Sequence, residues 1–191
     1  MAGHIISIVG GKGGVGKSVF AANLALAFLK EFGLKALLVD QDFTACGDQN
    51  LILGAKPTSS IIEAANHVGN YDTQSMIKLV VQHSSGLHYI SAPPTPSSIS
   101  KITVESLGRF YKGVRNVYPI VIVDCGSQLD SFALKALEFS TAIFVVTIPD
   151  ILVAHQTKRL VTEITDNLFP QDMIQVVINR FSQNAPVNPQ T

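Results

Sequence analysis

The fold of this chain is decided by residues 5–24, which read IISIVGGKGGVGKSVFAANL. The first five, Ile5–Val9, are apolar and mostly β-branched, as in a strand that is buried on both faces. Nine residues rich in glycine follow, Gly10–Ser18. The last two of them begin a stretch that has the composition of a helix. A strand that passes through a glycine-rich turn directly into a helix is typical of α/β folds.

The glycine-rich turn also matches a phosphate-binding pattern. Gly11–Ser18 fits G-x-x-x-x-G-K-[ST] at every fixed position. Glycines let consecutive backbone N–H groups point at phosphate oxygens, and the helix that starts there adds its positive end. Lys17 is expected beside the β- and γ-phosphates, and the Ser18 hydroxyl is expected to ligate Mg²⁺. The residues of this turn predicted to bind ATP are Gly11, Lys12, Gly13, Gly14, Val15, Gly16, Lys17 and Ser18.

The rest of the chain alternates between short apolar runs and longer helical stretches. The expected strands are Ile5–Val9, Ala36–Val39, Leu87–Ile90, Ile120–Val123, Ala142–Ile148 and Ile174–Ile178. The expected helices are Lys17–Phe32, Ser60–Val68, Thr73–Gln82, Thr103–Val117, Ser131–Phe139 and Ala154–Leu168. This order predicts a three-layer α/β sandwich with a mostly parallel sheet, the architecture of P-loop nucleotide-binding proteins.

Two segments are expected outside regular structure. The loop Ala92–Ser98 is too rich in proline for a helix or an inner strand, so we expect a surface connection that could also reach a partner. Residues 1–181 are expected to form the nucleotide-binding domain, and residues 182–191 a flexible tail.

Acidic residues follow two of the expected strands. Asp40 and Asp42 come after Ala36–Val39, and Asp124 comes after Ile120–Val123. Because ligands of parallel sheets bind at the carboxyl ends of the strands, we expect these carboxylates at the same edge as the phosphate loop. A strand-end aspartate is also a common turn former, but the order along the chain favours catalysis and Mg²⁺ binding for Asp42 and Asp124.

Composition narrows the class of protein. The 191 residues are enough for one domain with a sizeable core, and a net charge of zero gives no overall positive field that would attract nucleic acid. Charged residues make up 15%, against about 25% in ordinary soluble domains, so part of the surface is expected to be covered by a partner. Two separated cysteines, no basic leader and no apolar run of about 18 residues predict a cytoplasmic protein.

The segment Lys12–Ser18 resembles the deviant Walker A box of the ParA/MinD superfamily of ATPases. The resemblance implies that Lys12 reaches the phosphates bound in a second subunit, so that a sandwich dimer forms around two ATP molecules. It also implies that Asp42 positions the attacking water and that Asp124 holds Mg²⁺ through water. The sequence departs from the family just after Asp124: members usually have a proline soon after this aspartate, whereas this chain has Cys125-Gly126-Ser127.

The same resemblance extends to the last expected strand. Asn179-Arg180 is similar to the segment whose asparagine bonds the adenine ring, which implies that Asn179 and Arg180 contribute to nucleotide binding. From the residues alone, Asn179 is as easily an ordinary strand-end asparagine. The implied metal ligands are Ser18, Asp42 and Asp124, and the implied catalytic residues are Lys12, Lys17 and Asp42.

Three further segments resemble the CpaE/TadZ pilus-assembly branch of the superfamily. They are Cys46–Leu51, Ser91–Pro94 and Val146–Asp150. This resemblance implies a slow ATPase that positions a pilus or secretion machine, recruited to a pole or to the inner membrane face by polar or secretion-platform proteins. It also implies that the domain continues past Arg180 in such proteins, where a membrane-binding helix could lie.

Three alternatives to the slow ATPase remain open. The first is a scaffold that binds ATP and dimerises but scarcely hydrolyses it. The second is a MinD- or ParA-type division-site or DNA-partition ATPase, for which Arg109, Lys112 and Arg115 give only a modest basic stripe, with Lys158 and Arg159 on another helix. The third is an electron-transfer ATPase, which Cys46 and Cys125 do not favour because their positions do not suit an iron–sulfur cluster.

Overall fold

Seven strands form one sheet in the order β3-β4-β2-β5-β1-β6-β7 in the computed structural model, which describes residues 2–167 and 169–182. The strands are β1 (His4–Val9), β2 (Ala36–Asp40), β3 (Val81–Gln82), β4 (His88–Ile90), β5 (Ile120–Asp124), β6 (Ala142–Thr147) and β7 (Ile174–Ile178). All pairs are parallel except β3 with β4. The predicted mostly parallel sheet is confirmed. Of the predicted flexible tail, residues 183–191 lie outside the described residues.

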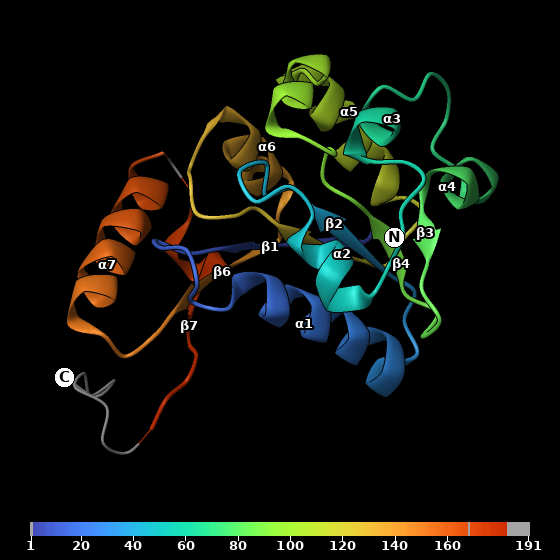
Figure 1. The fold of residues 1–191 in the computed structure, drawn as a ribbon. Coiled ribbons are helices and arrows are strands. Elements are labelled where there is room, and N and C mark those ends of the chain that lie inside the picture. Colours follow the sequence, from blue (N-terminus) through green and yellow to red (C-terminus); the bar gives the residue numbers. More distant parts are fainter. Residues whose placement is uncertain (1, 168, 183–191) are drawn as a thin grey trace.

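Helices cover both faces of this sheet (Figure 1). The α-helices are α1 (Lys17–Phe32), α2 (Asp48–Leu53), α3 (Ile61–Ala65), α4 (Thr73–Leu79), α5 (Val104–Val114), α6 (Ser131–Phe139) and α7 (Ile151–Asp166), and the 3-10 helices are η1 (Pro96–Lys101) and η2 (Gln171–Met173). In Figure 1, α1 lies below the sheet while α3, α5 and α6 lie above it. The protein is therefore the three-layer sandwich that the sequence predicts.

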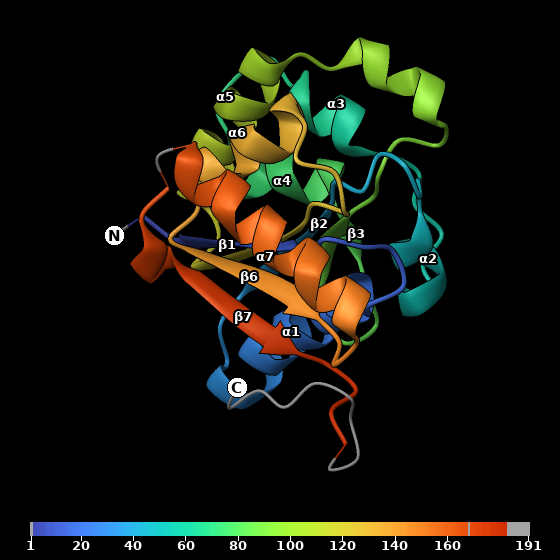
Figure 2. The ribbon, with the colours of Figure 1, turned by 90° about the vertical axis from the view of Figure 1, so that its left-hand side faces the viewer.

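Each interface between layers has its own apolar core. On one side, α1 packs alanines such as Ala21 and Ala25 against Ile8 and Ile122 of the sheet. On the other, Leu107 and Phe110 of α5 and their neighbours on α3, α6 and α7 pack against the opposite face. Because the central strands are apolar on both faces, their sequences show no alternation. Figure 2 shows β7 at the edge of the sheet, in front of β6.

One predicted helix is wrong at its end. The sequence predicts a helix over Thr73–Gln82, but α4 ends at Leu79 and the next residues form β3, an antiparallel edge strand. The turn from His83 to Gly86 lets His83 N–H donate to the Leu87 carbonyl, which closes a hairpin with β4. Apolar periodicity could not reveal a strand of only two residues, because its apolar residue also fits the helical pattern.

Other boundaries also differ from the predictions. The predicted Ser60–Val68 helix is shortened to α3, and α7 begins three residues earlier than Ala154, where the Asp150 carboxylate accepts from Val153 N–H. The helix α2 was not predicted, and part of the proline-rich loop forms η1 with Pro96 at its start. Proline is tolerated in a first helical turn because the N–H there needs no partner, so the expectation of no helix in this loop is wrong.

The sheet order brings the expected functional segments to one edge. Strand β1 lies between β5 and β6, and β5 lies between β1 and β2. Asp40 of β2 is directly opposite Asp124 of β5, and Val9 of β1 leads into the phosphate loop. Because these strands are parallel, their carboxyl ends form a single rim with the loop at its centre.

Candidate functional site

The phosphate loop joins β1 to α1 and depends on glycine conformations. Gly14 and Gly16 have φ values of 77° and 97°, in the left-handed region that side chains disfavour. A Cβ added at Gly16 would come within 2.3 Å of the Asn179 amide nitrogen, so this position has no room for any side chain. No side chain caps α1 at Gly16, so the free N–H groups of its first turn are available to an anion.

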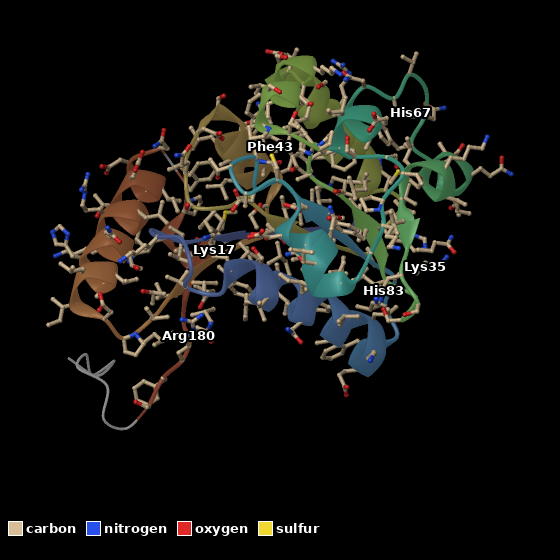
Figure 3. The ribbon with its side chains drawn as sticks, in the orientation of Figure 1. Lys17, Lys35, Phe43, His67, His83 and Arg180 are labelled. Carbon is tan, nitrogen blue, oxygen red and sulfur yellow. The ribbon has the colours of Figure 1, made fainter. Side chains whose placement is uncertain are left out.

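The two lysines of the loop are placed differently. Lys17 is buried, with 5% of its surface exposed, and its Nζ donates to the Lys12 carbonyl at 3.3 Å. The side chain of Lys12 is exposed. Figure 3 shows Lys17 well inside the outline of the molecule, with Arg180 below it at the end of β7. Lys17 is thus held within the site, whereas the side chain of Lys12 extends into solvent.

A cavity of about 500 Å³ opens over the loop. It gathers most of the predicted site: the phosphate loop, Asp42 from the β2–α2 loop, and Arg180 from the end of β7. The residues that line it are Gly13, Gly14, Gly16, Lys17, Ser18, Val19, Asp42, Thr44, Ala45, Asp48, Ile52, Ser127 and Arg180. Its size suits a ligand such as a nucleotide.

Some predicted site residues lie next to this cavity but do not line it. Val15 is buried in the core below, and the Asn179 amide donates to its carbonyl at 2.9 Å, which fixes the end of β7 against the loop. Gly11 lies against the backbone of α7, where a Cβ would come within 2.9 Å of Gln156. Asp124 is fully buried behind Ser18. Asn179 therefore supports the loop directly, whatever further contact it makes with a ligand.

Asp42 has one oxygen committed to its own loop. Its Oδ1 accepts from Thr44 N–H at 3.1 Å, from the Thr44 hydroxyl at 2.6 Å and from Ala45 N–H at 3.1 Å. All the hydrogen bonds that the carboxylate makes within the described part of the chain fall on Oδ1, so Oδ2 stays available to solvent or ligand. The carboxylate is thereby oriented at the cavity by its turn, as a water-positioning group needs.

The segment that follows Asp124 approaches Asp42 at Gly126. Gly126 has φ 73°, and a Cβ built there would come within 2.7 to 2.9 Å of the Asp42 carboxylate atoms. The glycine therefore allows the β5–α6 loop to approach Asp42 closely, while neighbouring Ser127 lines the cavity. A side chain at position 126 would meet the Asp42 carboxylate and displace it.

Behind the cavity lies a pair of buried carboxyl groups, Asp40 and Asp124. Burial, together with the nearby Asp124 carboxylate, raises the pKa of Asp40 to about 8. Burial also raises the pKa of Asp124, while hydrogen bonding from the Ser18 and Gln49 side chains opposes the rise. Because its pKa is about 8, Asp40 carries its proton near neutral pH. The two carboxyl groups then share a single negative charge.

The raised pKa of Asp40 predicts how stability depends on pH. Between pH 4 and 8 the folded state keeps a proton on Asp40 that the unfolded state releases, so stability should fall as pH rises through this window, by up to roughly 1.4 kcal/mol per pH unit. Asp40→Asn cannot titrate. In urea unfolding with EDTA present, its stability relative to the native chain should increase from pH 5 to pH 8. A difference that stays constant over this range would contradict the prediction.

Sequence reasoning missed several residues of the site. Gln49 is completely buried, and its Nε2 donates to the Ser18 carbonyl at 2.8 Å and to Asp124 Oδ2 at 3.0 Å. It lies on α2, which also contributes Asp48 and Ile52 to the cavity. Gly47 before this helix and Gly54 after it both have positive φ, and this pair of glycines was the available signal for α2.

Among the described residues, no helix combines the length and the apolar character that crossing a bilayer requires.

Comparisons with known proteins find relatives over most of the chain. Residues 6–188 match the family described as the CobQ/CobB/MinD/ParA nucleotide binding domain. An uncharacterised ATP-binding protein of Methanocaldococcus jannaschii, MJ0547, is 29% identical over 94% of the chain and 65% of its own length. The chain thus spans about 65% of this relative.

Solved structures share the fold. A ParA family ATPase from Chlorobium tepidum superposes with a TM-score of 0.87 at 25% identity, covering 96% of the chain and 76% of that protein. The septum site-determining protein MinD of Pyrococcus horikoshii, solved with Mg-ADP, superposes with a TM-score of 0.79 at 24% identity, covering 98% and 74%.

Proposed function

Because the chain belongs to the CobQ/CobB/MinD/ParA nucleotide-binding domain family, we propose that it binds ATP with Mg²⁺ and hydrolyses it slowly as a dimeric switch. The observation that carries the proposal is the cavity over the phosphate loop, in which Lys17, Ser18 and Asp42 meet. The Mg-ADP held by the similar MinD structure supports the choice of ligand.

The residues behind the cavity fit a hydrated Mg²⁺. Two buried oxygens behind the cavity lack a hydrogen-bond donor among the described residues: Asp124 Oδ1 and Gln49 Oε1. Mg²⁺ usually keeps several of its waters and binds through one or two carboxylates plus nucleotide phosphates, so it would bring donors to such acceptors. Ser18 and Asp124 would hold the ion, and Asp42 would face its water shell. When bound, Mg²⁺ would neutralise charge on the phosphates.

The chain's own residues account for binding and for positioning of the nucleophile. The N–H groups of the loop and of the first turn of α1 would bind phosphate oxygens. The Lys17 ammonium would give up its hydrogen bond to the Lys12 carbonyl and donate to phosphate oxygens instead. The free oxygen of Asp42 would orient a water towards the γ-phosphate. Arg180 and Asn179, at the end of β7, would contact the nucleoside end of the ligand.

The dimer is proposed from the surface around the same cavity. Apolar side chains are exposed beside it: Val19 is 52% exposed, Leu51 84% and Ile52 38%. With the exposed Lys12 they make a surface of apolar residues and one cation next to the bound phosphates, which would suit a second copy of the chain. ATP bound between two copies would then serve as part of the interface.

The dimer proposal is tested by sizing the protein with ATP, with ADP and without nucleotide. A dimer is expected with ATP alone, and Lys12→Ala is expected to remain a monomer with ATP while its affinity for ADP changes less than about threefold, because the lysine acts in the other subunit. Lys35→Ala is the matched control, an exposed lysine between α1 and β2 (Figure 3). Dimerisation of Lys12→Ala at the native ATP concentration would disprove this role for Lys12.

The finer proposal is that the switch positions a pilus or secretion machine of the CpaE/TadZ type. It is supported by the three segments Cys46–Leu51, Ser91–Pro94 and Val146–Asp150, one of which contains Gln49 and α2 beside the cavity. The name of the similar MinD protein, a septum site-determining protein, supports a role in positioning more generally. A cytoplasmic location, with recruitment to a pole or to the inner membrane face by a partner, belongs to the same proposal.

DNA partition is the less favoured function. Of the three basic residues in or just after α5, Arg109 and Lys112 line a cavity of about 660 Å³ together with Tyr71 and asparagine side chains. Arg115 is not among the residues that line it, and its Nε is buried. The three residues therefore do not form the single exposed basic stripe that would favour DNA binding.

A further inference from the structure

The side chain of Gln49 connects two parts of the site, Ser18 and Asp124, which lie 31 and 75 residues away from it in the sequence. Its single Nε2 donates one hydrogen to the carbonyl of Ser18 at 2.8 Å and the other to Asp124 Oδ2 at 3.0 Å. The orientation of the amide follows from its partners, because both are acceptors and a flipped amide would place its oxygen against them. Each N–H of the amide is therefore used.

We propose that Gln49 is the positioning residue for the magnesium ligands, holding the Ser18 end of the phosphate loop and the Asp124 carboxylate at a fixed separation. This inference rests on the proposed function, since it assigns Ser18 and Asp124 to the ion. With Oδ2 of Asp124 held by Gln49, the carboxylate presents Oδ1, which has no donor among the described residues, to the shell of the ion. Partners that orient metal ligands in this way contribute strongly to metal affinity.

The surroundings of Gln49 support a positioning role over simple packing. An apolar residue would fill the same buried volume without leaving Gln49 Oε1 as a buried acceptor that has no donor among residues 2–167 and 169–182. Such an atom has a cost in stability, so the amide is better explained by what its nitrogen does. Its neighbour Asn50 anchors the other side of α2, where Oδ1 accepts from Tyr89 at 2.7 Å and from Ser91 at 3.2 Å.

The experiment measures Mg²⁺ directly, through nucleotide binding. The binding of ADP with a fluorescent ribose label is followed in EDTA and then over a Mg²⁺ titration, for the native chain, Gln49→Met and Asn50→Ala. Gln49→Met keeps the volume but has no N–H. Its affinity for the nucleotide in EDTA is expected to stay within about threefold of native, while the Mg²⁺ concentration for half-maximal tightening is expected to rise about tenfold.

Asn50→Ala separates positioning from the stability of α2. It loosens the same helix on its far side, so it is expected to lower the melting temperature and leave the Mg²⁺ midpoint unchanged. A native midpoint in Gln49→Met, or an equal shift in Asn50→Ala, would overturn the inference. If Gln49→Met does not fold, Gln49→Asn replaces it: its amide is one methylene too short to reach both acceptors, and it should show the same shift.

The outcomes also separate this inference from the proposed function. If the native chain binds no labelled ADP with Mg²⁺, the proposed function fails and the role of Gln49 fails with it. If the native chain binds labelled ADP and responds to Mg²⁺, and Gln49→Met and Gln49→Asn have the same Mg²⁺ midpoint as the native chain, only the role of Gln49 fails.

Discussion

Replacing Lys17 with alanine is expected to abolish nucleotide binding at ordinary concentrations while leaving the fold intact. Lys17 is buried, and its ammonium has one hydrogen bond, to the Lys12 carbonyl, within the described part of the chain. A buried cation is stabilised far better by phosphate oxygens than by a single carbonyl. Loss of the charged contacts should reduce affinity for ADP and ATP by roughly 100-fold or more, which corresponds to about 3 kcal/mol.

Calorimetry with ADP and ATP measures this effect, and Lys30→Ala is the matched control. Lys30 is exposed in the last turn of the same helix, thirteen residues from Lys17 and therefore about 20 Å along the axis. Its removal should change affinity less than twofold. The melting temperature of Lys17→Ala in the absence of nucleotide should stay near the native value, because the substitution removes a buried charge that has few partners. An affinity close to native in a folded Lys17→Ala protein would refute the assignment of the phosphate loop.

The sequence was sufficient for the parts of the fold that repeat a strong pattern. The continuous apolar runs identified β1, β2, β5 and β6 closely, and α1 and α6 have the predicted bounds. These elements surround the phosphate loop, so the position of the loop followed from them. The strand-end positions of Asp40 and Asp124 were likewise predictable, because a parallel sheet brings carboxyl ends together.

The parts missed from the sequence are those set mainly by tertiary contacts, although Gly47 and Gly54 gave one local signal for α2. The helix α2 has six residues and no apolar period, and it is held in place by the side chains of Gln49 and Asn50, whose partners are distant in the sequence. The strand β3 exists because it pairs with β4, and nothing local distinguishes it from the end of α4. Gln49 was missed for the same reason, since a hydrogen bond across 75 residues leaves no spacing to recognise.

Composition predicted that part of the surface is covered, but it did not predict which part. The low charge content predicted a covered surface, and exposed apolar residues do occur beside the cavity, at Leu51 and Ile52. Composition could not say where they would lie, because it carries no information on neighbours in space. The proposed dimer gives this surface an occupant, and the sizing experiment on Lys12→Ala tests it.

Replacing Asp42 with asparagine is expected to stop ATP hydrolysis while preserving ATP binding. Oδ1 of Asp42 accepts three hydrogen bonds that fix its loop, and an asparagine oxygen can accept them as well. What the variant loses is the negative charge and the second carboxylate oxygen that would orient the attacking water. Groups of this kind typically contribute about 100- to 10,000-fold to the rate, so phosphate release should fall at least about 100-fold.

Asp48→Asn is the matched control for Asp42→Asn. Asp48 is exposed, lines the same cavity and carries the same charge, but the sequence gives it no role in positioning water. Its replacement should change the rate of phosphate release less than about fivefold. If the carboxylates acted only through their charge in the cavity, the two variants would lose the same fraction of this rate. Phosphate release is measured alongside binding of ATP, because Asp42→Asn should bind it within about threefold of native and still form the ATP dimer. Equal rates of phosphate release for the native protein and Asp42→Asn would favour the scaffold, in which bound ATP joins two copies and is not hydrolysed. The reason is that only the reaction with water needs the free oxygen of the Asp42 carboxylate.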